Sequence, residues 1–213
     1  MKEPAFPYPS IAISKCLGFG RCRYNGEMRS DPLIERLKGF ADCRPVCPEM
    51  EIGLGVPRDP IRVVRDRGHL ILHQPATDRD LTDAMRAFID RYFADLPEID
   101  GFILKSGSPS CGPAGVKVYA GFKPRAKILT GAGFFAAAVQ ARRPGIPVED
   151  EGRLTNFTIR EHFLTWVFTR ARLRAISRPA RNRDVREELY WSIFHPVPPA
   201  LRKQLGRMKR GED

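Results

Sequence analysis

The sequence predicts an α/β fold in which helices cover a mainly parallel sheet, with a small helical appendage at the C-terminus. Three observations support this prediction. Short apolar runs that suit buried strands alternate with longer segments whose apolar residues recur at helical spacing. The resulting order of strand, helix, strand, helix and strand is typical of a parallel sheet. A chain of 213 residues, 42% of them hydrophobic, is also long enough to bury a substantial core.

The first two strands and the helix between them are expected within residues 11–47. They are a strand at 11–14, a helix that starts near Pro32 and ends at Gly39, and a strand that ends at Cys47. Proline suits the first turn of a helix, and Ser30 or Asp31 can cap it. The segment 16–26 is rich in glycine and therefore predicts a loop.

The remaining elements of the main domain follow in the same alternating order. They are a hairpin of 61–65 with 70–72, a helix from Thr77 or Asp78 to about Asp95, a strand at Gly101–Leu104, a helix at about 131–142 and a short strand at 146–148. The hairpin is predicted because Asp66-Arg67-Gly68 separates two apolar runs with residues that favour a turn.

Glu151-Gly152 marks a predicted boundary between a main domain, residues 1–150, and a C-terminal segment, residues 151–213. Helices are expected in this segment at about 156–176 and 184–194, followed by a basic tail. Two helices bury little surface alone. The segment therefore either packs on the main domain or pairs with another chain in a homo-oligomer.

Basic residues are concentrated in the C-terminal segment. The whole chain has a formal net charge of +11, and residues 151–213 alone hold 14 Lys or Arg against 7 Asp or Glu. Such an asymmetry favours a polyanionic partner, most simply a nucleic acid such as tRNA. The alternative is a solvated basic helix face that has no partner.

The sequence favours a cytoplasmic protein that does not enter a membrane. No apolar run reaches the ~18 residues that a membrane span needs. The first ten residues, MKEPAFPYPS, lack the apolar stretch of a signal peptide. An odd number of cysteines, five, without an export signal argues against a disulfide framework.

Three of the cysteines follow predicted strands. Cys16 ends the first strand, Cys47 ends the second, and Cys111 lies in the loop after the third. The carboxyl ends of parallel strands meet at one edge of a sheet, so these thiols are expected to share a metal site. No C-x2-C pair is present, and three separate thiolates suit a cubane iron–sulfur cluster better than a closed zinc site. The fourth iron would then be open to substrate.

Three motifs carry a resemblance to a known family: ISKCLGFGRCRYNG, then PVCPE followed by GLGVPR, then KSGSPSCG. Together they resemble the signature of the thiouracil desulfurase (TudS) family over roughly residues 10–150. The start of the C-terminal segment, RLTNFTIREHFLTWVFTRARLRAI, resembles a truncated form of an uncharacterised domain that is fused behind the first in tRNA 4-thiouridine desulfidases.

The resemblance implies a [4Fe–4S] cluster held by Cys16, Cys47 and Cys111. It also implies that Glu49 transfers protons and that Ser108 is a polar helper. The sequence departs from the family pattern at three places: Gly18-Phe19, Cys22 in place of a common aliphatic residue, and Asn25 in place of the usual Asp. Weaker candidates for substrate contact are Arg23, Tyr24, Arg58 and Lys105. Cys22 and Cys43 are expected to be structural, and the alternative for Cys43 is a spare ligand.

The expected function is a [4Fe–4S]-dependent, non-redox desulfidase that removes sulfur from a thiolated pyrimidine, either a free base, a nucleoside or 4-thiouridine in tRNA. A thiocarbonyl sulfur is soft and prefers iron to a hard cation. The alternative is a protein without catalytic activity: an iron–sulfur or zinc protein that binds nucleic acid or senses redox state. An open iron beside a carboxylate favours the enzyme, whereas a fourth thiolate favours the sensor.

Overall fold

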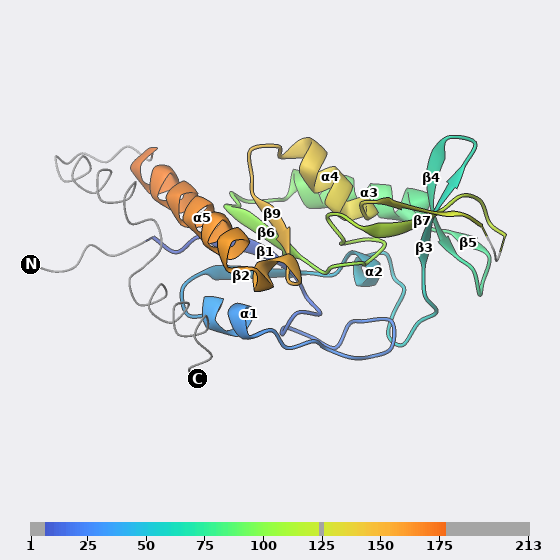
Figure 1. Cartoon of the computed structure of the whole chain (residues 1–213), viewed down its shortest axis with the longest axis horizontal. Helices are drawn as coiled ribbons and strands as arrows, with labels where there is room; N and C mark the ends of the chain where they lie inside the picture. Colours follow the sequence, from blue (N-terminus) through green and yellow to red (C-terminus); the bar gives the residue numbers. More distant parts are fainter. Residues whose placement is uncertain (1–6, 124–125, 178–213) are drawn as a thin grey trace, which may run out of the picture.

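The computed structural model describes residues 7–123 and 126–177, which contain two sheets (Figure 1). The first sheet is entirely parallel, with the strand order β2-β1-β6-β9. Its strands are β1 (Ser10–Ser14), β2 (Asp42–Val46), β6 (Gly101–Leu104) and β9 (Val148–Asp150). The predicted parallel sheet is therefore confirmed, and each of its strands lies within about two residues of its expected position.

The second sheet has the order β5-β4-β3-β7-β8 and lies at the end of the molecule away from α5 (Figure 1). Its strands are β3 (Arg62–Asp66), β4 (His69–Gln74), β5 (Arg79–Asp80), β7 (Val116–Tyr119) and β8 (Ile128–Gly131). The hairpin of β3 and β4 agrees with the prediction. Strands β7 and β8 were not predicted, and each is only four residues long.

Helices α1 to α4 lie between strands along the chain, and η1 and α5 follow the last strand. They are α1 (Pro32–Leu37), α2 (Pro48–Glu51), α3 (Thr82–Ala94), α4 (Phe134–Arg142) and α5 (Phe157–Ser177), with a 3-10 turn η1 (Arg153–Thr155) before α5. Asp31 caps α1 as one of the two expected residues, because its carboxylate accepts bonds from two backbone N–H groups of the first turn.

The predicted start of α3 was wrong. Thr77 and Asp78 precede the short strand β5, and Asp78 has a φ of 50°, so neither residue caps the helix. Instead the Asp80 carboxylate accepts a hydrogen bond of 2.8 Å from the backbone N–H of Thr82, the first helical residue. Thr77 and Asp78 belong to the tight turn into β5, although the helical pattern of the residues that follow predicted that one of them caps the helix.

Two hydrophobic clusters cover the two faces of the parallel sheet. Ile11 and Ile13 of β1 pack with α1 and α5, whereas Ala12 of the same strand packs with α3 and α4. This follows from the strand geometry, in which successive side chains point to opposite faces. The helices thus form a layer on each side of the sheet and leave the strand ends free to carry a site.

Helix α5 is part of this core. Phe163, Leu164, Val167 and Phe168 are buried against β1 and α1. A methyl group on Gly101 of β6 would come within 2.6 Å of the Val167 side chain, so the missing side chain lets α5 approach the sheet closely. The helix expected at 184–194 lies outside the described residues. No helix in the described ranges is long and apolar enough to span a bilayer.

Candidate metal centre

Cys16, Cys47 and Cys111 meet at the carboxyl edge of the parallel sheet. Cys16 follows β1, Cys47 directly follows β2, and Cys111 lies in the loop after β6. All three side chains line one cavity of about 240 Å³ and are at most 9% exposed. Neighbouring parallel strands end at the same edge, which explains why thiols so far apart in sequence come together.

A fourth thiol lines the same cavity. Cys22, in the loop after β1, is 4% exposed, and its backbone carbonyl lies 3.9 Å from the Cys47 Sγ. Contact with the Cys16 thiol raises the pKa of Cys22 to about 11. We call the space bounded by Cys16, Cys22, Cys47 and Cys111 the thiol cavity. Cys43 is on β2, packs against the same hydrophobic cluster that contains Cys16, Cys22 and Cys47, and is not among the residues that line the cavity.

The thiols suit a cluster better than a single ion. Four thiolates around one zinc at 2.3 Å lie within about 4 Å of one another. In the described part of the chain, no three His, Cys, Asp or Glu side chains are arranged to hold one metal ion. Buried soft donors around a cavity of this size instead fit a group with several irons, each taking one thiolate.

The pKa values of two of these thiols are raised above the ordinary value of 9.0. Burial raises the pKa of Cys111 to about 12. Contact with the Cys22 side chain, together with burial, raises the pKa of Cys47 strongly. Thiolates are the form that binds metal, so loading the site must release protons.

Glu49 lies beside the thiols and is 9% exposed. It is placed by α2, which begins at Pro48 immediately after Cys47. Arg58 donates two hydrogen bonds to its Oε2, at 2.6 and 2.9 Å, and the Arg58 side chain is only 4% exposed. The other carboxylate oxygen, Oε1, is left to face the serine loop. Arg58 was only a weak candidate for substrate contact in the sequence, and the structure places it against the carboxylate.

Ser110 contacts Glu49 more closely than Ser108 does. The Ser110 hydroxyl donates to Glu49 Oε1 at 2.7 Å, whereas the Ser108 hydroxyl lies 3.5 Å away, at the limit of a hydrogen bond. Ser108 instead accepts a bond of 3.1 Å from the backbone N–H of Cys111 and so shapes the loop. The two hydroxyls are 3.0 Å apart, which joins Ser108, Ser110 and Glu49 into one network.

The other sequence candidates, Arg23, Tyr24 and Lys105, also line the thiol cavity. Lys105 Nζ donates to Glu151 Oε1 at 2.5 Å, and both the backbone N–H and the hydroxyl of Ser106 donate to the same carboxylate. Glu151 is 7% exposed. Burial alone would raise the pKa of Glu151, but the bonds from Lys105 and Ser106 outweigh burial and hold it below its ordinary value of 4.5. Glu151 thus ties the loop after β6 to the end of β9.

We expect Glu151→Gln to lower the free energy of unfolding by about 3 kcal/mol at pH 7, because it leaves Lys105 charged and unpaired in a buried place. A carboxyl whose pKa is lowered by folding stabilises the protein above its unfolded pKa, and this contribution disappears as the pH falls through the folded value. The difference between wild type and variant should therefore shrink below pH 4.5. Denaturant unfolding at several pH values measures it.

Glu149→Gln is the matched control for this prediction. Glu149 pairs with an Arg153 side chain that is 55% exposed, so its loss should cost less than about 1 kcal/mol. Equal destabilisation by the two variants would contradict a special role for the Lys105–Glu151 pair.

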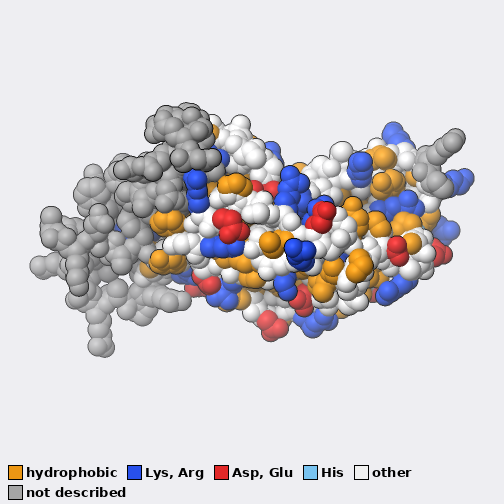
Figure 2. All heavy atoms as spheres, turned by 90° about the horizontal axis from the view of Figure 1, so that it is seen from below, with side chains coloured by type: hydrophobic (Ala, Val, Ile, Leu, Met, Phe, Trp, Pro, Cys, Tyr) orange, Lys and Arg blue, Asp and Glu red, His pale blue; other side chains and the backbone are white. Residues whose placement is uncertain are grey.

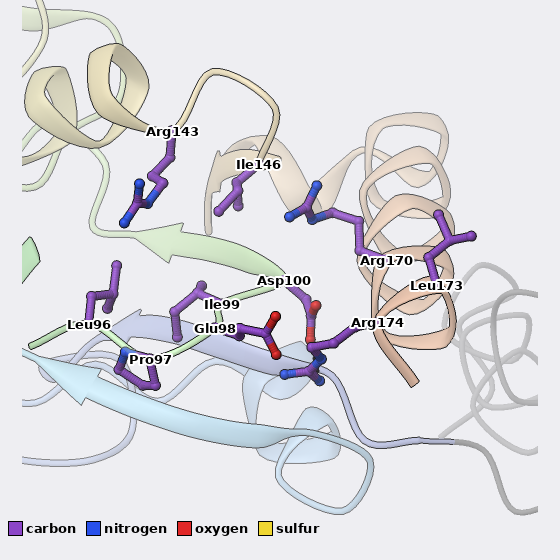
Figure 3. A pocket seen from close by; sticks show the side chains of 10 residues that line it. All are labelled: Leu96, Pro97, Glu98, Ile99, Asp100, Arg143, Ile146, Arg170, Leu173 and Arg174. Atoms are coloured by element: carbon purple, nitrogen blue, oxygen red, sulfur yellow. Dashed lines mark ion pairs between the residues drawn. The ribbon is translucent and has the colours of Figure 1, made fainter. Parts of the chain in front are cut away.

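A larger cavity of about 560 Å³ lies at the opposite edge of the parallel sheet, before β6 (Figure 3). Three arginines define it, and we call it the arginine cavity: Arg143 after α4, and Arg170 and Arg174 on α5. Arg174 pairs with Asp100 at 2.8 Å, and burial raises the pKa of Asp100 even though the Ser10 N–H and Arg174 oppose the shift. Its lining contains no thiol or hydroxyl, so size alone does not make it the reactive site.

Comparison with known proteins supports the thiol cavity as the functional region. A family model described as 2-thiouracil desulfurase matches residues 11–151. Uncharacterized protein YbbK of Bacillus subtilis (strain 168) is 31% identical over 153 residues, which cover 68% of this chain and 98% of that protein. A solved structure described as a [4Fe-4S]-dependent thiouracil desulfidase, TudS, has a TM-score of 0.52 and 28% identity, and the match covers 69% of this chain and 93% of the other. Every residue that lines the thiol cavity lies within the range matched by the family model.

Proposed function

Because the chain belongs to the 2-thiouracil desulfurase family, we propose that it is a [4Fe–4S]-dependent desulfidase that converts the thiocarbonyl of a pyrimidine into a carbonyl. The observation that carries the proposal is the meeting of buried thiols with the buried carboxylate of Glu49 in one cavity. The similar solved structure is itself described as a [4Fe-4S]-dependent thiouracil desulfidase. Cys16, Cys47 and Cys111 are the proposed ligands of the cluster.

When bound, the cluster supplies a soft Lewis acid for the sulfur of the thiocarbonyl. The protein's own residues transfer the protons. Glu49 is the proposed base that takes a proton from water at Oε1, while Arg58 holds Oε2 in place. Water adds its oxygen to the carbon, the C–S bond breaks, and the proton held by Glu49 is available to the departing sulfide. The overall reaction of thiocarbonyl and water to carbonyl and hydrogen sulfide changes no oxidation state.

Ser110 and Ser108 orient this carboxylate. Ser110 donates to the same Oε1 that would receive the proton, and Ser108 contacts Ser110. A carboxylate fixed by an arginine on one oxygen and hydroxyls on the other cannot rotate freely, so its position relative to the thiols is set before substrate arrives. Ser110 is therefore proposed alongside Ser108 as a helper.

Anaerobic purification tests the proposal directly. We expect brown protein with about four irons per chain, the content of a cubane cluster. The same preparation should release hydrogen sulfide from 2-thiouracil, 4-thiouracil or 4-thiouridine, and comparison of the three ranks free base against nucleoside. Stoichiometric zinc without iron, or a full cluster without turnover of any thiolated pyrimidine, would contradict the proposal.

The second candidate function is a cluster protein that senses redox state without catalysis. The position of Cys22 favours it, since four thiols lining one cavity can satisfy all four irons of a cubane. The two functions differ in turnover and in the response to substrate. A sensor keeps its iron spectrum when 2-thiouracil is added, whereas a desulfidase changes it.

We also propose thiolated tRNA as a substrate, recruited by the C-terminal segment. Figure 2 shows basic, acidic and hydrophobic side chains interspersed over one face of the described residues, so that face offers no continuous basic surface. Residues 178–213 add a net charge of +4 over 36 residues, with 9 Lys or Arg against 5 Asp or Glu. Arg143 and Arg170 of the arginine cavity add further positive charge. A neutral free base gains nothing from such charge, whereas RNA phosphates do.

Shortening the chain after Ser177 tests this recruitment. A cut at residue 151 is unsuitable because it removes the buried side chains of α5 from the core. We expect the shortened protein to process a free thiopyrimidine normally but to bind tRNA at least ~10-fold more weakly, about 1.4 kcal/mol. A full-length variant in which the nine Lys and Arg of residues 178–213 are changed to Gln should show the same normal activity on a free thiopyrimidine and the same loss of tRNA affinity. Unchanged tRNA affinity at one fixed salt concentration would refute the recruiting role.

A further inference from the structure

Cys22 is built into the thiol cavity rather than into a separate part of the core. Its side chain lines the cavity with those of Cys16, Cys47 and Cys111. Its backbone carbonyl accepts a hydrogen bond of 2.9 Å from Arg58 Nη2. The same arginine nitrogen donates to Glu49 at 2.6 Å, so one buried side chain fixes both Cys22 and the carboxylate.

The three proposed ligands leave one coordination position of a [4Fe–4S] cluster unfilled. Thiolate is the usual ligand of iron in such clusters. A thiol held in the same cavity competes with solvent at a high effective concentration, because it does not have to diffuse to the site. Cys22 is 4% exposed, so its side chain is buried at the cavity and does not extend into solvent.

We propose that Cys22 is a fourth, displaceable thiolate, which occupies the open iron of the resting protein and gives way to the thiocarbonyl substrate. This inference rests on the proposed function for the identity of the cluster. In this role the Cys22 thiol would release its proton to solvent when its sulfur binds the cluster. When the substrate sulfur replaces it, the thiolate takes a proton back. No electrons are transferred in either direction.

A displaceable thiolate would select for sulfur-containing substrates. A soft thiocarbonyl sulfur competes with a thiolate for iron, whereas the carbonyl oxygen of the desulfurised product competes poorly. Cys22 therefore favours binding of substrate over product. It also shields the open iron from solvent while no substrate is present.

Mössbauer spectroscopy of the full chain reconstituted with ⁵⁷Fe under anaerobic conditions tests the proposal. Wild-type protein should show four similar, thiolate-bound irons. Cys22→Ala and Cys22→Ser should retain about four irons but show one that is distinct. Cys43→Ala is the matched control, since Cys43 lies outside the cavity lining, and it should match wild type. Adding 2-thiouracil to wild type should make one iron distinct, and the KM for 2-thiouracil should fall at least ~10-fold in Cys22→Ala.

Two outcomes would overturn the proposal. One is a wild-type cluster that already has a distinct iron and does not change in Cys22→Ala. The other is loss of the whole cluster from both Cys22 variants, which would make Cys22 an essential ligand. Failure of the proposed function gives a different pattern. Suppose that wild type has four equivalent irons and Cys22→Ala has one distinct iron, but neither protein turns over substrate. This result would support Cys22 as the fourth ligand and contradict the proposed desulfidase activity.

Discussion

Cys16→Ala, Cys47→Ala and Cys111→Ala should each abolish both iron binding and desulfurisation. Each substitution removes one of the thiols that line the cavity and leaves a hole that no remaining side chain fills. Each variant keeps only two of the three permanent ligands, and the displaceable thiolate of Cys22 does not replace the third, so the cluster is poorly retained. The measurements are iron per chain, the visible spectrum, and hydrogen sulfide released from 2-thiouracil.

The remaining cysteines supply the controls for this prediction. Cys43→Ala and Cys22→Ala should both keep about four irons, since neither thiol is among the three proposed ligands. Circular dichroism of each variant shows whether it folds, which separates loss of a ligand from loss of the fold. Complete loss of iron in Cys43→Ala with native folding would mean that the proposed ligand set is wrong.

The convergence of Cys16, Cys47 and Cys111 could be predicted from the sequence because it depends on a general rule. The strands at 11–14 and 101–104 are short apolar runs, and parallel pairing with the strand that ends near Cys47 brings the three carboxyl ends to one edge. The predicted layers of helices follow from the same order of elements. Cys16 and Cys47 lie within two residues of a strand end, and Cys111 lies in the loop that follows β6.

The position of Cys22 depends instead on the path of a loop. Residues 16–26 contain several glycines, and Gly18 has a φ of 87°, which residues with side chains rarely adopt. The pattern of apolar residues therefore does not predict the path of this loop. Cys22 was expected to be structural, and the folded loop brings its thiol into the cavity.

Side-chain pairings inside the site were likewise hard to predict. Ser108 and Ser110 are two residues apart in a loop, and nothing in the sequence tells which hydroxyl faces Glu49. Arg58 follows a glycine- and proline-rich stretch and reaches back to α2 over a separation of nine residues. Glu151 reaches Lys105 over 46 residues. Such contacts are set by the tertiary packing of loops, which local patterns do not record.

Glu49→Gln should keep the cluster and lower the rate of desulfurisation by about 10²–10⁴-fold, the usual cost of losing a general acid or base. The amide preserves the size of the side chain, and its oxygen can still accept a bond from Ser110, but it cannot take a proton from water. Rapid mixing with excess 2-thiouracil measures the rate, and the iron content shows that the cluster remains.

Glu51→Gln is the matched control, because Glu51 lies on the same helix and is exposed. It should react at the wild-type rate. Glu49→Gln also leaves Arg58 charged and nearly buried, so unfolding must be followed in parallel. An unchanged rate in folded, iron-loaded Glu49→Gln would assign Glu49 to holding Arg58 and Ser110 in place and would require another base in the cavity.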